Sequence, residues 1–116
     1  MSMPLSRAII GRAYALIVDE KRWCWGALAR DEGGRPVEPT DEAARRWCAL
    51  GALIAAAHEL VGDLCQAHHL ADLAARKMHR RSLSKLNDTQ GHAAVLALFQ
   101  GSIDGRRLNA TKARRM

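Results

Sequence analysis

Apolar residues recur along the segment 46–60 with the spacing of an α-helix. The intervals between them alternate between three and four residues, which places them in one stripe on the helix surface. The stripe consists of Ala43, Trp47, Leu50, Ile54, Ala57 and Val61. A second row of small apolar residues consists of Ala44, Cys48, Ala52, Ala55 and Ala56. Because little polar face is left for water, we predict a buried central helix from about Asp41 to Leu60, with Thr40 as its N-cap.

Three other segments show the same helical period. We predict a first helix over residues 4–18, a third over 63–80 and a fourth over 90–104, with residues 82–86 as a connector. Asp63 is a suitable N-cap for the third helix. The run from Asn87 to Gln90 is rich in capping residues, and we expect it to start the fourth helix. Gly105 is expected to end that helix.

The spacing of apolar residues changes from a helical to an alternating pattern between the first two predicted helices. Small and apolar residues alternate from Trp23 onward, and a Gly-Gly turn follows Asp31. Pro36 and Pro39 restrict the second arm to the edge of a sheet. This segment, which ends at Pro39, is predicted to be a short β-hairpin or an ordered loop.

These elements define a mainly α fold. We expect four helices in a bundle-like or orthogonal domain around the buried central one, with the hairpin or loop between the first two. Tryptophans 23, 25 and 47 are expected to fill the seam between that loop and the core. Residues 1–105 would form a single domain, and residues 106–116 a basic, disordered tail.

Size and composition limit the class of protein. With 116 residues and 48% hydrophobic residues, the chain is long enough for one core. We find neither a secretory signal nor an apolar run of membrane-spanning length, so we expect a cytoplasmic protein. The three cysteines Cys24, Cys48 and Cys65 are irregularly spaced, and we expect them to be reduced thiols.

Two stretches carry a family resemblance: RWCALGAL at residues 46–53 and LNDTQGHAAVLALF at residues 86–99. Together with WGALARDEGGRPVEP at residues 25–39, they resemble a family of small uncharacterised bacterial proteins, a domain of unknown function. That family has a Trp-Cys-Ala-x-Gly-Ala helix and an Asn-Asp pair before its last helix. The resemblance implies no activity. It marks as family features Trp23, Arg30, Asp31, Cys48, Gly51, Asn87 and Asp88.

Cysteine chemistry is one candidate function. Cys48, His92 and Asp88 supply a thiol, a base and an orienting carboxylate, which are the groups of a cysteine-dependent hydrolase or transferase. Catalytic cysteines usually lie at an exposed helix start. Cys48 is predicted to lie about two turns inside the central helix, so we expect a buried residue and assign no catalytic group.

Metal binding is a second candidate function. Cys65, His68 and His69 have helical spacing, but no second ligand pair accompanies them, so we expect no metal site and no cofactor.

Polar residues near the predicted ends of elements form another candidate site. Arg30, Asp31, Asn87 and Asp88 would line a cleft for a polar ligand. The favoured alternative is that Asp31 forms the hairpin turn, that Asn87 and Asp88 cap a helix, and that Arg30 pairs with one of these acids.

Positive charge is concentrated in the last third of the chain. Residues 1–75 contain eight Lys/Arg and ten Asp/Glu, whereas residues 76–116 contain ten and two. Electrostatic nucleic-acid binding would use Arg76, Lys77, Arg80, Arg81, Lys85, Arg106 and Arg107. The only aromatic residue in this third, Phe99, is predicted to point inward, so we find no base-stacking surface there.

We therefore favour a non-enzymatic accessory or regulatory protein that binds another macromolecule. Its partner would be a second protein or a second copy of itself in a homodimer, with no role for a membrane. Nucleic-acid binding is the first alternative, and cysteine-dependent catalysis at Cys48 is the second.

Overall fold

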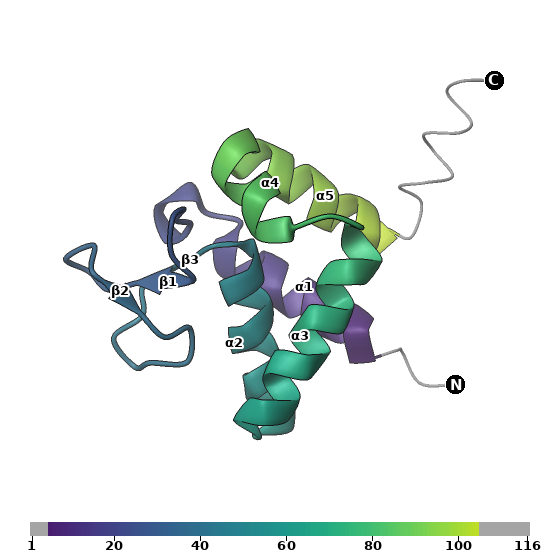
Figure 1. Cartoon of the computed structure of the whole chain (residues 1–116), viewed down its shortest axis with the longest axis horizontal. Helices are drawn as coiled ribbons and strands as arrows, with labels where there is room; N and C mark the ends of the chain where they lie inside the picture. The colour runs from purple at the N-terminus through teal and green to yellow at the C-terminus, as the bar shows by residue number, and fades with distance from the viewer. Residues whose placement is uncertain (1–4, 105–116) are drawn as a thin grey trace.

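The helix α2 (Ala49–Val61) lies at the centre of the computed structural model, which describes residues 5–104. It packs against both α1 (Leu5–Ile17) and α3 (Leu64–Met78) (Figure 1). The buried residues of α2 are Ala49, Gly51, Ala52, Leu53, Ile54, Ala56 and Ala57. The prediction of a buried central helix is therefore confirmed.

The start of this helix was predicted wrongly. It begins at Ala49 and not at Asp41, because residues 41–48 satisfy their backbone groups in other ways. The Asp41 side chain accepts a hydrogen bond from the Ala43 amide at 2.8 Å and closes a turn. Arg46 and Trp47 form the strand β3 (Arg46–Trp47). Cys48 is the N-cap of α2, and its Sγ accepts a hydrogen bond from the Gly51 amide at 3.3 Å.

Three two-residue strands form an antiparallel sheet in the order β2-β1-β3. The hairpin consists of β1 (Ala29–Arg30) and β2 (Pro36–Val37), and β2 lies at the edge of the sheet. In Figure 1 the sheet lies to one side of the helices, beside the start of α2. The third strand was not predicted, because its apolar residue Trp47 fits a strand and the helical stripe equally well.

The C-terminal third contains two helices where we predicted a connector and one helix. α4 (Leu83–Gln90) begins after Ser82, whose Oγ accepts a hydrogen bond from the Lys85 amide at 3.1 Å. α5 (His92–Asp104) follows Gly91, which has a φ of 92° and so breaks the helical path. The prediction that Asn87 to Gln90 cap the last helix is therefore wrong, since these residues form the second half of α4.

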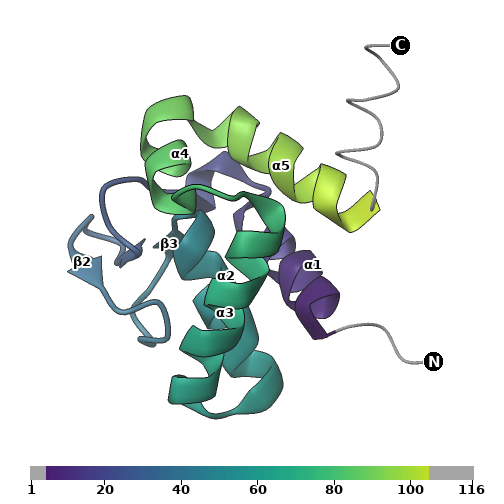
Figure 2. The ribbon, with the colours of Figure 1, turned by 45° about the vertical axis from the view of Figure 1, so that its right-hand side comes forward.

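Residues 5–104 thus form five α-helices and one 3₁₀ turn, η1 (Glu20–Arg22). The mainly helical class is confirmed, whereas the number of helices exceeds the four we expected. Figure 2 shows α4 and α5 crossing above α2 and α3. Within residues 5–104, no helix has both the length and the apolar character needed to cross a membrane. The expected tail at 106–116, with Arg106 and Arg107, lies outside the described residues.

Candidate functional site

A single buried amide, that of Asn87, joins three separate segments of the chain. Its Oδ1 accepts hydrogen bonds from Trp23 Nε1 at 2.7 Å and from the Ala49 amide at 2.9 Å. Its Nδ2 donates to the Cys24 carbonyl oxygen at 3.1 Å. The residue is 0% exposed. Because every polar atom of this side chain has a partner, Asn87 fixes the loop after η1 and the start of α2 to α4.

Asp88 holds the same loop one residue further along. Its Oδ1 accepts hydrogen bonds from the Gly26 amide and from Asn87 Nδ2, each at 3.1 Å. Gly26 has a φ of 80°, a backbone conformation that residues other than glycine rarely adopt. Asn87 and Asp88 therefore act together as anchors of the segment around Trp25.

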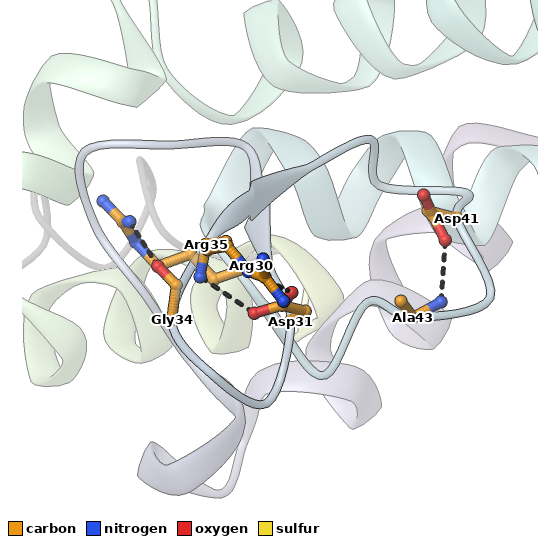
Figure 3. A network of polar contacts seen from close by, with 6 residues as sticks. All are labelled: Arg30, Asp31, Gly34, Arg35, Asp41 and Ala43. Atoms are coloured by element: carbon orange, nitrogen blue, oxygen red, sulfur yellow. Dashed lines mark hydrogen bonds and ion pairs between the residues drawn. The ribbon is translucent and has the colours of Figure 1, made fainter.

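Arg30 and Asp31 stabilise the hairpin (Figure 3). Arg30 donates to the Gly34 carbonyl oxygen at 2.8 Å and to the Trp25 carbonyl oxygen at 3.1 Å, so it pairs with carbonyls and not with an acid. Asp31 Oδ1 accepts from the Arg35 amide at 2.8 Å, and this hydrogen bond lowers the pKa of Asp31. These contacts agree with a turn-forming role for Asp31.

The four polar candidates therefore do not converge on one cleft. Arg30 alone among them lines the cleft of about 570 Å³ that we call the tryptophan cleft. Its lining residues are Glu20, Trp23, Cys24, Trp25, Arg30, Gly34 and Arg46. The side chain of Trp25 is 62% exposed at this cleft, so it does not fill the seam with the core as we predicted.

Two arginines lie side by side in the tryptophan cleft. Arg30 of β1 and Arg46 of β3 are directly opposite partners in the antiparallel pair, so their side chains leave the sheet on the same face. The Arg30 side chain is held by the two carbonyls, whereas the Arg46 side chain makes no hydrogen bond or ion pair within the described part of the chain. Like charges in opposite positions destabilise a sheet. An anion bound between them would relieve this repulsion.

Cys48, His92 and Asp88 do not form a hydrogen-bonded triad in the described residues 5–104. His92 Nε2 donates to the Ile17 carbonyl oxygen at 2.7 Å, and its ring centroid lies 5.4 Å from that of Trp23. Asp88 is bonded to Gly26 and Asn87. Neither side chain forms a hydrogen bond with Cys48 Sγ anywhere in residues 5–104.

Cys48 does lie at a helix start, contrary to our prediction that it is two turns inside the helix. It is nevertheless only 3% exposed, and this burial raises the pKa of its thiol despite hydrogen bonds from the backbone amides of Gly51 and Leu50. Burial likewise raises the pKa of Cys24 to about 11. Both thiols are therefore held in the unreactive protonated form at neutral pH.

The three metal candidates Cys65, His68 and His69 are exposed on α3. In the described range 5–104, no group of three or more His, Cys, Asp or Glu side chains has the arrangement of a metal site.

Three of the basic candidates line a second cavity, of about 240 Å³, between the end of α3 and the start of α4. They are Arg76, Arg80 and Arg81. Arg76 forms an ion pair with Asp72 at 2.8 Å. Of the others, Lys77 donates to Ser6 Oγ at 3.2 Å, and Lys85 is exposed on α4.

Taken together, these features define a small α-helical protein whose surface cleft is built on a short sheet. The chain belongs to the family of unknown function DUF6197, whose model matches residues 1–104. This finding confirms the resemblance to a domain of unknown function. No curated protein and no solved structure matched the chain.

Sequence reasoning missed the tryptophan cleft because its two arginines are brought together by strand pairing. Arg46 was placed inside a helix, and Trp25 was placed in the seam between the loop and the core. The alternation of Arg46 and Trp47 next to a turn closed by Asp41 was the only local signal for a strand.

Proposed function

We propose that this protein is a non-enzymatic binding protein whose tryptophan cleft binds an acidic segment of a partner protein. The observation that carries the proposal is that the adjacent pair Arg30 and Arg46 lines the same cleft as the exposed Trp25. Tryptophan and arginine are the residues that most often dominate binding energy in protein interfaces. Arginine also pairs with carboxylates in a bidentate geometry.

The cleft is rigidly supported before any partner binds. Asp88 holds the Gly26 amide, Asn87 holds the Cys24 carbonyl, and Arg30 holds the Trp25 carbonyl. A loop fixed in this way loses little conformational entropy on binding. Among the described residues, Glu20 is the only acidic one that lines the cleft, so the two guanidinium groups give this lining a net positive charge that complements an acidic segment.

The protonated state of the buried thiols supports binding over catalysis. A nucleophilic cysteine needs a lowered pKa and a base within hydrogen-bond reach. Cys48 has a raised pKa, and His92 is bonded to the Ile17 carbonyl. The cysteine-dependent alternative therefore receives no support from this geometry.

The proposal is tested by panning a phage-displayed library of random twelve-residue peptides against the full chain. We expect the selected peptides to be enriched in Asp and Glu and to lose at least about tenfold in affinity for Trp25→Ala and for Arg46→Gln. The matched control is Arg45→Gln, which removes the same charge one residue away. Arg45 instead donates to the Glu42 and Ala44 carbonyls. Circular dichroism would check that each variant folds.

Three outcomes would overturn the proposal. Selected peptides without an excess of acidic residues would remove the charge argument, and equal binding to the Arg46→Gln variant would remove the cleft. Displacement of the peptides by ATP at a lower concentration than by a glutamate-rich peptide would make the occupant a nucleotide. Sedimentation of the wild type as a dimer, with the Trp25→Ala variant a monomer, would make the occupant a second copy of the chain.

A further inference from the structure

A second cationic cavity lies on a different part of the surface from the tryptophan cleft. We call it the arginine pocket, and the polar side chains at its rim include Arg76, His79, Arg80, Arg81 and Asp72. Its floor includes Leu50, Ala75 and Leu83. The tryptophan cleft and the arginine pocket share no lining residue.

The link between α3 and α4 places two arginines in this pocket without partners. The linking residues are 79–82, between the end of α3 at Met78 and the start of α4 at Leu83. Neither Arg80 nor Arg81 forms a hydrogen bond or an ion pair within the described residues 5–104. Asp72, the one acidic side chain at the rim within residues 5–104, is already paired with Arg76. The two free guanidinium groups therefore remain available to an anion.

The distribution of positive charge around the pocket favours a polyanion, and not a single small ion, as its ligand. Residues 73–87 contain five Lys/Arg and no Asp or Glu. Lys85 extends the positive surface along α4. The N-terminus of α4 also lines the pocket, and the N-terminus of a helix carries partial positive charge. A cavity of about 240 Å³ is large enough to admit a phosphate group.

We infer that the arginine pocket binds one backbone phosphate of a nucleic acid, with Arg80 and Arg81 as its direct contacts. Adjacent phosphates would lie over the exposed basic surface beside it. Recognition of this kind is independent of base sequence and weakens with salt, because binding releases counterions from the nucleic acid.

The test is fluorescence anisotropy of a labelled 20-base-pair DNA duplex with the full chain, measured from 50 to 300 mM NaCl. The Arg80→Gln/Arg81→Gln variant is expected to bind at least about tenfold more weakly at 50 mM NaCl. The slope of log affinity against log salt should fall by roughly one, because the two arginines share one phosphate and about one counterion is released per neutralised phosphate. The Arg80→Lys/Arg81→Lys variant keeps the charges and should retain most of the slope.

The matched control is Lys21→Gln/Arg22→Gln, which removes two exposed charges on η1, away from the pocket. It should change the affinity by less than about threefold. An equal loss in both double variants would mean that net charge alone drives binding, and it would overturn the inference.

Two further measurements test whether the nucleic acid binds at another basic segment, and whether the pocket is instead a site for free phosphate. A variant truncated after residue 105 tests the basic C-terminal segment. The pocket is excluded if truncation abolishes binding while Arg80→Gln/Arg81→Gln leaves it unchanged. Competition with inorganic phosphate, against NaCl of the same ionic strength, tests for a small-ion site. Full displacement of the duplex by a few millimolar phosphate would show a site for free phosphate and would also overturn the inference.

Discussion

Buried apolar side chains, many of them alanines, hold helices α1, α2 and α3 together, whereas the segment 23–48, which places only Ala29, Ala44 and Trp47 in the core cluster of the described residues, is fixed largely by polar side chains bonded to its backbone. In α3 the buried residues are Ala67, Ala71, Ala74, Ala75 and Met78. The segment 23–48 has only two-residue strands, and it depends on Asn87, Asp88 and Arg30 for its position. The same chain therefore uses area-dependent burial in one region and a few specific hydrogen bonds in the other.

Single substitutions will therefore differ in effect between the two regions. A helix packed through many alanines distributes its stabilisation over many contacts, whereas a loop held by one buried amide concentrates it. The largest effects are therefore expected where the two regions meet, at the start of α2.

Gly51 is the point of closest approach between the two regions. A Cβ at this position would lie 1.9 Å from the Leu28 carbonyl oxygen, which itself accepts a hydrogen bond from the Cys48 amide. The backbone must shift to accept Gly51→Ala, so we expect a loss of about 4 kcal/mol or more in the free energy of unfolding, measured by urea denaturation.

The matched control for this prediction is Gly11→Ala in the middle of α1. A Cβ there has no atom within 4 Å, so the variant should gain about 0.5–1 kcal/mol from its helix propensity. If Gly51→Ala were also neutral or stabilising, the close approach of loop and helix would be disproved.

Asn87 is expected to have the next largest effect. Asn87→Ala leaves the Ala49 amide and the Cys24 carbonyl oxygen without their partner in a buried site. Each orphaned buried group costs about 1–3 kcal/mol, so we expect a loss of about 3 kcal/mol in urea denaturation. The control is Gln90→Ala on the same helix, which is exposed and should change stability by less than about 0.5 kcal/mol. A loss below about 1 kcal/mol for Asn87→Ala would show that the loop does not depend on this amide.

These two positions also show how far the sequence alone could predict the molecule. The helices α1, α2 and α3 were predictable because helical periodicity is a local signal, carried here by rows such as Ala67, Ala71 and Ala74. Gly51 was marked as a family feature, but its neighbour Leu28 lies 23 positions earlier in the chain.

Asn87 was misinterpreted for a physical reason. An asparagine before an apolar helix is typical of an N-cap, and nothing local distinguishes that role from a bond to the Cys24 carbonyl 63 positions away. The same holds for Arg46, whose position opposite Arg30 depends on strand pairing. Long-range polar contacts carry the candidate site, and such contacts leave no periodic signal.

The buried thiol of Cys24, near the start of α2, predicts a pH dependence of intermediate size in the free energy of unfolding. The pKa of Cys24 rises from its ordinary value of 9.0 to about 11, mainly through burial and secondly through the nearby Cys48. The folded state therefore disfavours the thiolate, and stability that is present below pH 9 is lost as the pH rises toward 11. Between these pH values we expect the wild type to lose on the order of 1 kcal/mol more than Cys24→Ala, measured by urea denaturation.

Thiol reactivity gives an independent check of the same burial. At pH 7.5, Ellman's reagent should modify Cys65, which is exposed, and should reach Cys24 and Cys48 only after unfolding. The Cys65→Ser variant should therefore show almost no fast reaction. A fast phase that persists in Cys65→Ser would contradict the protonated, buried state of the other two thiols and would reopen the cysteine-dependent alternative.

The smallest effect is expected from a polar contact inside the helical region. Arg12 of α1 and Glu59 of α2 form a bidentate ion pair. Arg12 Nε donates to Glu59 Oε1, and Arg12 Nη2 donates to Glu59 Oε2 at 3.1 Å. Their side chains are 46% and 53% exposed, so a double-mutant cycle with Arg12→Ala and Glu59→Ala should give a coupling energy of about 0.5 kcal/mol. The Arg12 hydrogen bond lowers the pKa of Glu59, so the coupling should be present above pH 4.5 and vanish as the pH falls below it. It should also fade in 0.5 M NaCl. A coupling above about 2 kcal/mol would mean that α1 and α2 depend on polar contacts as strongly as the segment 23–48 does, and the contrast between the two regions would fail.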